Sequence, residues 1–374
     1  MKIFPMAAKD GRLKQFYTPI RSNKAYFNDN DALAIFCRKT NTPFLRDRFG
    51  YLNQFSKINI SEQNDIFPSS NFTKTLEELM ITRATIVAQL IKESNKKLYV
   101  LWSGGVDSTS ILLAMLAVLD RKDYERFGIV HTESSIEEYP KLYKYLKTIN
   151  IELYQLDGSF FFDEWYKVAE EHYVISGYPA DQLFGSIIHQ DYPGLYFTDW
   201  RDWIKEKIAI EQFSNAFNYY NLPITTFGEF TWFMNFSTRW HIVNKDILRH
   251  IGKQESNTIN FFDTKEFQDW SVSNFDKLHR YDQNNAKYYK LELKQFCNKI
   301  FPDNDYYLNK GKVDSTTYAI KSGSSLYIKV NPFIIIEEDN NIYKIDYPYS
   351  NIDNKDTQKY YDTFIRRIIA KYRK

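Results

Sequence analysis

Between residues 98 and 177 the chain alternates short apolar runs with longer amphipathic stretches. The apolar runs have the length of buried strands and lie at residues 98–102, 127–132, 151–156 and 172–177. The stretches between them have the length and spacing of helices and lie at residues 108–120, 135–149 and 160–171. This alternation predicts an α/β fold with a doubly wound parallel sheet, in which ligands bind beyond the carboxyl ends of the strands.

The N-terminal part has a weaker pattern. Residues 1–72 contain four prolines and many aromatic side chains, which favours an irregular segment or a small β region over long helices. Apolar residues then recur near helical spacing, and predict a helix over residues 73–94. Its cap is expected from one of two threonines and one of two glutamates, namely Thr73 or Thr75 and Glu77 or Glu78.

The C-terminal half is expected to be mostly helical, with a small appended β-hairpin. Helical patterns cover residues 195–300, whereas β-branched runs flank an Asp-Asn-Asn turn within residues 325–347. A last helix is expected at about residues 357–372. We therefore divide the chain into an N-terminal segment, an α/β domain and a C-terminal hairpin with a helix, at residues 1–72, 73–320 and 321–374.

Composition limits the kind of protein. A length of 374 residues predicts two to three domains, and a formal net charge of +2 argues against a nucleic-acid partner. Two cysteines, Cys37 and Cys297, exclude a Cys-x-x-Cys zinc site and favour a reducing compartment. The longest apolar run, residues 111–119, is half a membrane span, and the start does not resemble a signal peptide. We expect a cytoplasmic protein with no membrane contact.

The first apolar run passes directly into Ser-Gly-Gly-Val-Asp-Ser at residues 103–108 and then into a helical stretch. The two glycines let the backbone approach an anion closely, and a helix N-terminus attracts anions. The hydroxyls of Ser103, Ser108 and Thr109 are expected to face the same point. Asp107 would repel a polyphosphate unless a divalent cation lay between them, so it indicates Mg²⁺. The alternative is an ordinary Gly-Gly turn before a helix.

No Walker A loop and no Gly-x-Gly-x-x-Gly after a strand occurs in the chain. Residues 103–108 instead resemble the pyrophosphate-binding loop of the N-type ATP pyrophosphatases, the PP-loop superfamily. Members of that superfamily cleave ATP between the α and β phosphates, adenylate a substrate oxygen and release pyrophosphate. The resemblance implies a sheet of the adenine nucleotide alpha hydrolase type, with ATP and Mg²⁺ as cofactors.

A second carboxylate, Asp181, follows the fourth apolar run and either caps a helix or faces Asp107 across Mg²⁺. Residues 176–186 resemble the S-G-E-G-[AS]-D-E-L-F-G-G loop of the synthetase domain of asparagine synthetases. Residues 260–267 and 287–292 resemble two further segments of that domain, P-F-L-D-x-x-[FL] and K-x-x-L-R-x.

The resemblance implies three groups of site residues. Adenine and ribose would be lined by Leu101, Val130 and Gly177. The phosphates would be bound by Ser103, Gly104, Gly105, Asp107 and Ser108, and Mg²⁺ by Asp107 and Asp181. A catalytic lysine would follow the last helix of the domain, where Lys310 and Lys312 are both candidates.

Several residues depart from the asparagine synthetase pattern. Residue 2 is Lys2, where the family carries the catalytic cysteine of its glutaminase domain, so we expect ammonia or an amine as nitrogen donor. Tyr178 and Pro179 replace a glutamate and a glycine. A tyrosine there resembles the β-lactam synthetases, where it pairs with a carboxylate to deprotonate the attacking nitrogen. Glu229 could be that carboxylate, or Tyr178 could simply pack in the pocket wall.

The sequence as a whole thus predicts an ATP-dependent, AMP-forming carbon–nitrogen ligase. It would adenylate a small-molecule carboxylate and join it to an amine or ammonia as an amide. The alternatives are a PP-loop enzyme that modifies a nucleotide or nucleic-acid base, and a degenerate protein that only binds nucleotides. His131 would lie near the nucleotide, as a wall residue or a catalytic one. Residues 1–72 or the hairpin could shape the acceptor pocket or a homodimer contact.

Overall fold

The computed structural model describes most of the α/β region and parts of the two ends. The described residues are 2–7, 18–19, 32–40, 47–55, 65–156, 164–185, 194–240, 257–278, 290–309, 333–338 and 341–346. Three predictions concern residues outside these ranges: the helix at 357–372, the apolar run at 326–330, and the two lysines Lys310 and Lys312.

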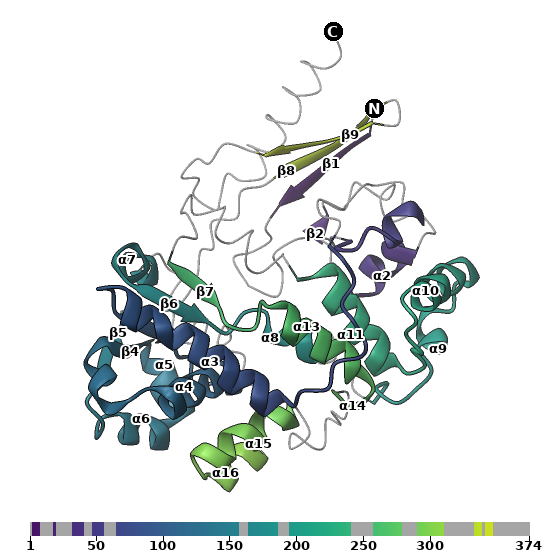
Figure 1. Ribbon diagram of the computed structural model, residues 1–374. Coiled ribbons are helices and arrows are strands. Elements are labelled where there is room, and N and C mark those ends of the chain that lie inside the picture. Colours follow the sequence, from purple (N-terminus) through teal and green to yellow (C-terminus); the bar gives the residue numbers. More distant parts are fainter. Residues whose placement is uncertain are drawn as a thin grey trace.

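A five-stranded, all-parallel sheet forms the core of the α/β region, on the left of Figure 1. Its spatial order is β5 (Glu152–Gln155), β4 (Phe127–His131), β3 (Leu98–Leu101), β6 (Tyr173–Ser176) and β7 (Thr258–Asn260). The chain enters at β3, moves outward through β4 and β5, and returns to the other side of β3 with β6 and β7. The order therefore reverses between β3 and β6. This reversal is the topological switch point, where open α/β sheets bind ligands.

The side chains of the strands alternate between two hydrophobic clusters, as the pleat requires. Leu98 and Val100 of β3 belong to the large cluster, which also contains α3 (Leu76–Glu93) and α4 (Val106–Val118). Tyr99 belongs to a smaller cluster with Trp165 of α7 (Glu164–Glu171). Both faces of the sheet are thus covered by helices, which confirms the predicted α/β class.

The helices between the strands follow the sequence pattern with local changes. α3 begins with a capping box in which Thr75 and Glu78 bond each other's backbone N–H groups, one of the expected pairings. The single helix predicted over residues 135–149 is two helices, α5 (Glu133–Glu138) and α6 (Pro140–Leu146). Tyr139 leaves the helical conformation because the proline that follows disfavours it there. A short 3₁₀ helix, η3 (Arg121–Arg126), precedes β4.

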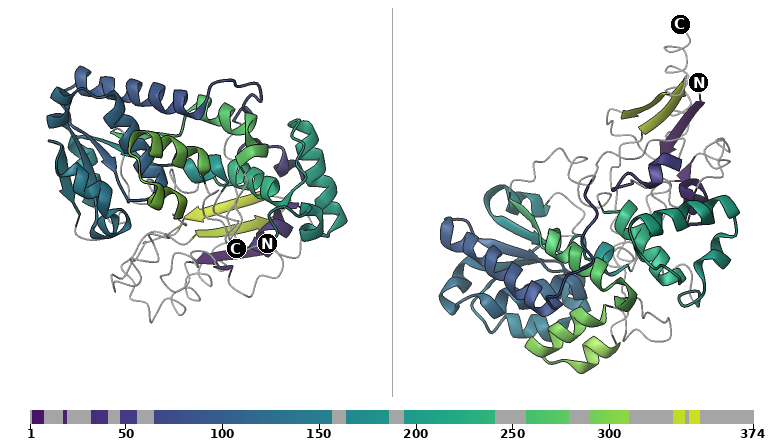
Figure 2. Two further views of the ribbon diagram at one scale, coloured as in Figure 1. Left: turned by 90° about the horizontal axis from the view of Figure 1, so that it is seen from below. Right: turned by 45° about the vertical axis from the view of Figure 1, so that its right-hand side comes forward.

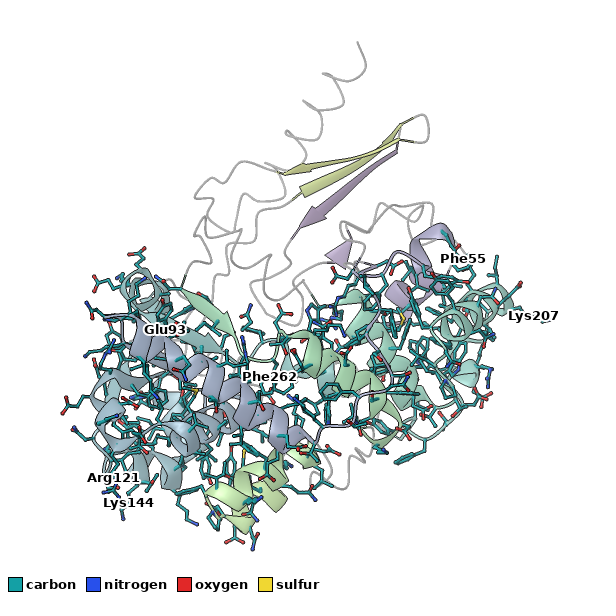
Figure 3. The ribbon with its side chains drawn as sticks, viewed as in Figure 1. Phe55, Glu93, Arg121, Lys144, Lys207 and Phe262 are labelled. Carbon is teal, nitrogen blue, oxygen red and sulfur yellow. The ribbon has the colours of Figure 1, made fainter. Side chains whose placement is uncertain are left out.

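A helical, aromatic-rich region lies beside the sheet (Figures 1 and 3). Its members are α2 (Ala32–Thr40), η2 (Leu52–Phe55), α9 (Trp200–Ile204), α10 (Lys207–Tyr219) and α11 (Phe227–Thr238). Trp200 stacks on Phe230 with ring centroids 5.1 Å apart, and both are fully buried. The mostly helical C-terminal half continues with α13 (Lys265–Ser273), α14 (Phe275–Leu278), α15 (Leu291–Ile300) and α16 (Asn304–Asn309).

A second, antiparallel sheet joins the two ends of the described chain (Figure 2). Its order is β2 (Thr18–Pro19), β1 (Lys2–Ala7), β8 (Phe333–Glu338) and β9 (Asn341–Asp346). The predicted hairpin is confirmed, because β8 and β9 pair from Phe333↔Asp346 to Glu338↔Asn341. The sequence did not predict that β1 would pair with β8. In the part of the chain that the structure describes, no helix is long and apolar enough to cross a membrane.

Candidate nucleotide site at the switch point

The loop between β3 and α4 carries the Ser-Gly-Gly-Val-Asp-Ser motif. Gly104 has a φ of +77°, and a Cβ there would lie 2.6 Å from the carbonyl oxygen of Ser135 and 2.8 Å from Cβ of Glu138. Only glycine fits this conformation and this contact with α5. Gly105 is the N-cap of α4, and it has no side chain that could accept the first N–H groups of the helix. Those N–H groups therefore need other hydrogen-bond acceptors.

Two serine hydroxyls hold the loop in shape. Ser108 Oγ accepts the N–H of Ser103 at 3.0 Å and lies 3.0 Å from Ser103 Oγ. Ser103 Oγ in turn accepts the N–H of Gly105 at 3.3 Å. The two hydroxyls therefore bond to each other and to the backbone of the loop. Thr109 differs, because its hydroxyl accepts the indole N–H of Trp102 at 3.1 Å in the core.

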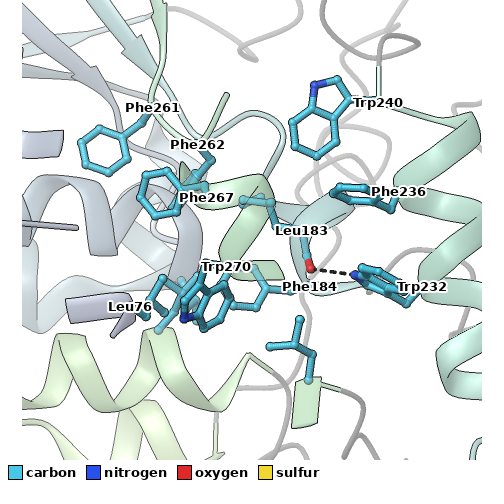
Figure 4. Packing of buried hydrophobic residues seen from close by; sticks show 14 of the residues in the cluster. Leu76, Leu183, Phe184, Trp232, Phe236, Trp240, Phe261, Phe262, Phe267 and Trp270 are labelled. Atoms are coloured by element: carbon cyan, nitrogen blue, oxygen red, sulfur yellow. Dashed lines mark hydrogen bonds between the residues drawn. The ribbon is translucent and has the colours of Figure 1, made fainter. Parts of the chain in front are cut away.

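The loop after β6 contacts the first loop. A Cβ on Gly177 would lie 3.4 Å from Cβ of Asp107, so the two chain segments are in direct contact. Asp181 follows in the first turn of α8 (Ala180–Phe184). The backbone of α8 is fixed from outside: Asn235 Nδ2 donates to the carbonyl of Asp181 at 2.7 Å, and Trp232 Nε1 donates to that of Leu183 at 3.1 Å (Figure 4).

A lysine from a third element joins the two aspartates. Lys290 Nζ lies 2.6 Å and 2.5 Å from the two carboxylate oxygens of Asp107 and 2.7 Å from Oδ1 of Asp181. The lysine side chain is 2% exposed, against 28% for Asp107 and 25% for Asp181. The two carboxylates thus reach the same cation at the switch point. Lys290 is the N-cap of α15, with a left-handed φ of 49°.

Sequence reasoning did not assign a role to Lys290. The residue lies in the segment 287–292 that resembles the K-x-x-L-R-x helix, and this was the only signal in the sequence that could have found it. Cys297 of the same helix is fully buried, and burial together with the charge of Asp107 raises the pKa of its thiol. The thiol therefore stays protonated and serves as a small apolar packing group.

Tyr178 lies between β6 and α8, half-buried beside Asp181. Burial and the negative charge of Asp181 raise the pKa of Tyr178 to about 12. This shift is opposite to the lowering that a general base requires, so at neutral pH the phenol can donate a hydrogen bond. The expected pairing with Glu229 is not found among the described residues. Glu229 instead caps α11, where its carboxylate accepts the N–H groups of Thr225 and Thr226 at 2.8 and 2.9 Å.

The remaining candidates lie at the same sheet edge or beyond the described residues. Val130 is fully buried in the smaller cluster, and its carbonyl accepts the N–H of Trp102 at 2.9 Å. Leu101 packs partly against that cluster. His131 is 1% exposed, and its Nδ1 lies 3.3 Å from the carbonyl oxygen of Thr132. Burial lowers the pKa of His131, so its side chain is a neutral group of the core.

The donor set at the switch point fits a Mg²⁺ ion that is shared with a ligand. Two carboxylates already hold one cation, the Lys290 ammonium, between them. Within the described ranges no group of three or more histidine, cysteine, aspartate or glutamate side chains could bind a metal by itself. Mg²⁺ is commonly held by one or two carboxylates plus phosphate oxygens and water, so Asp107 and Asp181 suit this mode.

No protein-family model matches the chain, and no curated protein matches it either. What can be said of the site therefore depends on its geometry and on the motif residues themselves.

Proposed function

We propose that the chain is an ATP-dependent, AMP-forming ligase of the PP-loop type, with a sheet of the adenine nucleotide alpha hydrolase kind. The observation that carries this proposal is the meeting of Asp107 and Asp181 on one buried cation at the switch point. An ion pair that served only stability would not need to lie beside the glycine loop of residues 103–108 and the start of α4, at the same edge of the sheet. Together these features match a site for a polyphosphate with its divalent cation.

The chain's own groups would bind ATP in a defined direction. The loop of residues 103–108 would surround the β and γ phosphates with N–H groups and hydroxyls. Leu101 and Gly177 would lie along the adenosine, and the fully buried Val130 would support Leu101 from the core. Asp107 and Asp181 would hold Mg²⁺, which when bound would neutralise charge on the leaving pyrophosphate. The Lys290 ammonium would stay beside the same phosphates and add a second positive charge.

The reaction has two displacements. A carboxylate oxygen of the acceptor attacks the α phosphorus, the bond to the α–β bridging oxygen breaks, and pyrophosphate leaves with the electron pair. An amine or ammonia then attacks the acyl carbon, loses a proton, and AMP leaves. The protonated Tyr178 phenol would hydrogen-bond the acceptor beside Asp181, whereas Lys310 or Lys312 would stabilise charge on the α phosphate. The product is an amide.

The test is a product assay with the full chain, ATP, Mg²⁺ and a metabolite extract as the source of carboxylate and amine. We expect AMP and pyrophosphate with a new amide mass. Asp107→Asn should lower the rate by about a hundredfold or more, because it removes a carboxylate that would hold Mg²⁺ while it keeps the shape of the side chain. Asp120→Asn is the matched control, since that carboxylate is exposed beyond the other end of α4.

Other products would separate the alternatives. ADP with inorganic phosphate would contradict cleavage between the α and β phosphates. AMP release that depends on added RNA, with a modified base in place of an amide, would indicate the nucleic-acid-modifying class. Tight binding of ATP without turnover in any extract would indicate a protein that only binds nucleotides.

A further inference from the structure

The peptide between Gly104 and Gly105 is held from outside the loop by a tyrosine far along the chain. The hydroxyl of Tyr306, in α16, donates to the carbonyl oxygen of Gly104. The hydroxyl of Thr109, in the first turns of α4, also interacts with the Tyr306 oxygen. One phenol thus contacts the phosphate loop and the start of the helix that follows it.

Several contacts fix the position of this phenol. The ring of Tyr306 stacks on that of Tyr139 with centroids 3.5 Å apart and planes 2° from parallel. Asp303 accepts the N–H of Tyr306 at 3.3 Å, and its other oxygen accepts the hydroxyl of Tyr139 at 3.3 Å and lies 3.2 Å from Lys141 Nζ. The tyrosine is therefore attached to the junction of α5 and α6, and α5 also contacts Gly104 through Ser135 and Glu138.

The hydrogen bond from Tyr306 to the carbonyl of Gly104 affects how the loop can bind a ligand. The carbonyl and the N–H of a trans peptide point in opposite directions. When the carbonyl of Gly104 is fixed toward Tyr306, the N–H of Gly105 must point away, toward Ser103 Oγ and the interior of the loop. A Gly-Gly peptide is free to rotate to other orientations, because neither residue has a Cβ that forbids them.

We infer that Tyr306 is a positioning residue of the phosphate loop, which acts by aiming the N–H of Gly105 at the β and γ phosphates. The role rests on the proposed function, since it needs a polyphosphate at this loop. It predicts a selective effect: loss of the hydroxyl weakens ligands that reach the loop and spares those that stop at the α phosphate.

The test compares Tyr306→Phe with Tyr307→Phe in the full chain, by calorimetric titration with pyrophosphate plus Mg²⁺, with ATP plus Mg²⁺, and with AMP. Both variants remove one hydroxyl from the same tyrosine group, but that of Tyr307 contacts Tyr139 and not the loop. We expect Tyr306→Phe to weaken pyrophosphate and ATP by about five- to tenfold and to leave AMP unchanged. Tyr307→Phe should leave all three unchanged.

A second measurement reports on the loop without a ligand. Amide hydrogen exchange of the segment 102–110 should become faster in Tyr306→Phe and stay as in the wild type in Tyr307→Phe. Equal loss of AMP and pyrophosphate, equal effects of the two variants, or unchanged pyrophosphate binding would each overturn the positioning role alone. A wild-type chain that binds neither pyrophosphate nor ATP would overturn the proposed function, and the role of Tyr306 with it.

Discussion

The buried ammonium of Lys290 separates two carboxylates that would otherwise repel each other. With one lysine and two aspartates the group carries a formal charge of −1. Its removal would leave like charges facing each other in a partly desolvated place. Loss of one partner from a buried ion pair is far more costly than loss of an exposed pair.

Lys290→Met should lower the free energy of unfolding by about 3 kcal/mol in the absence of divalent ions, because two carboxylates lose their common partner. Mg²⁺ should restore part of this loss and should raise the melting temperature of the variant more than that of the wild type. Thermal denaturation with and without Mg²⁺ measures both effects.

Lys299→Met is the matched control for that experiment. Lys299 belongs to the same helix but is 65% exposed and pairs with the exposed Glu77. Its loss should change stability by less than about 1 kcal/mol and should not alter the response to Mg²⁺. A similar response to Mg²⁺ in the wild type and Lys290→Met would contradict a cation site shared by the two aspartates.

His131 should make stability depend on pH. Burial lowers its folded-state pKa below the ordinary 6.5, so the unfolded chain takes up the proton first as the pH falls. The contribution of the neutral imidazole is complete above the unfolded pKa and is lost as the pH falls from there through the lower folded pKa. Denaturant unfolding of the wild type and His131→Phe between pH 8 and pH 5 should give a shallower decline for the variant. Parallel curves would contradict this account.

Individual site residues were predictable to different degrees. Asp107 and Asp181 each follow an apolar run that reads as a strand, and parallel strands end at one edge, so their approach followed from the pattern. Lys290 was not predictable in this way. Its contacts reach back 183 residues to Asp107 and 109 residues to Asp181, and no periodicity encodes them.

The turn from β3 into α4 depends on the absence of a side chain at Gly104. Gly104→Ala should lower the free energy of unfolding by more than about 2 kcal/mol, since the left-handed conformation costs about 1–2 kcal/mol and the Cβ would collide with the backbone of α5. Gly194→Ala separates these two causes. Gly194 has a φ of +80° but no atom within 4 Å of the added Cβ, so the conformational cost alone applies. Equal losses in urea denaturation would contradict the collision.

Two departures from the predicted elements have local causes. Pro140 divides the second helix, because the residue before a proline avoids the helical region and Pro140 itself suits a first helical turn. β7 was not predicted, since Thr258–Asn260 is only three residues long and has no alternation to detect. It is a strand because β6 offers it an edge, with Ser176 Oγ donating to Asn260 Oδ1 at 2.7 Å.

At the scale of the molecule, the alternation of strands and helices predicted a parallel sheet but not the order of its strands. The order depends on which side of β3 the chain returns to after β5, and tertiary packing decides this. The pairing of β1 with β8 could not be predicted either, because the hydrophobic pattern of a strand does not say which strand lies beside it. Whether the chain divides at residues 72 and 320 stays a prediction.

Removal of residues 1–7 should expose one edge of β8 and weaken the hairpin. A two-stranded hairpin is marginally stable in water, whereas a third strand supplies a further row of hydrogen bonds. Hydrogen exchange of residues 333–338 should therefore become faster in the truncated chain. Exchange of β4 should stay unchanged, because that strand lies in the other sheet. Unchanged exchange in β8 would contradict the pairing.

The pairing of β1 with β8 also affects the order in which the parts of the protein can fold during synthesis. Lys2 pairs with Glu337, so the first strand leaves the ribosome long before its neighbour exists. At synthesis rates of about 5–20 residues per second the delay is roughly 20 to 70 seconds. For that time the nascent chain carries a strand with an open edge, and the α/β region can fold first. During this interval the open edge of β1 is the part of the nascent chain that a chaperone would protect.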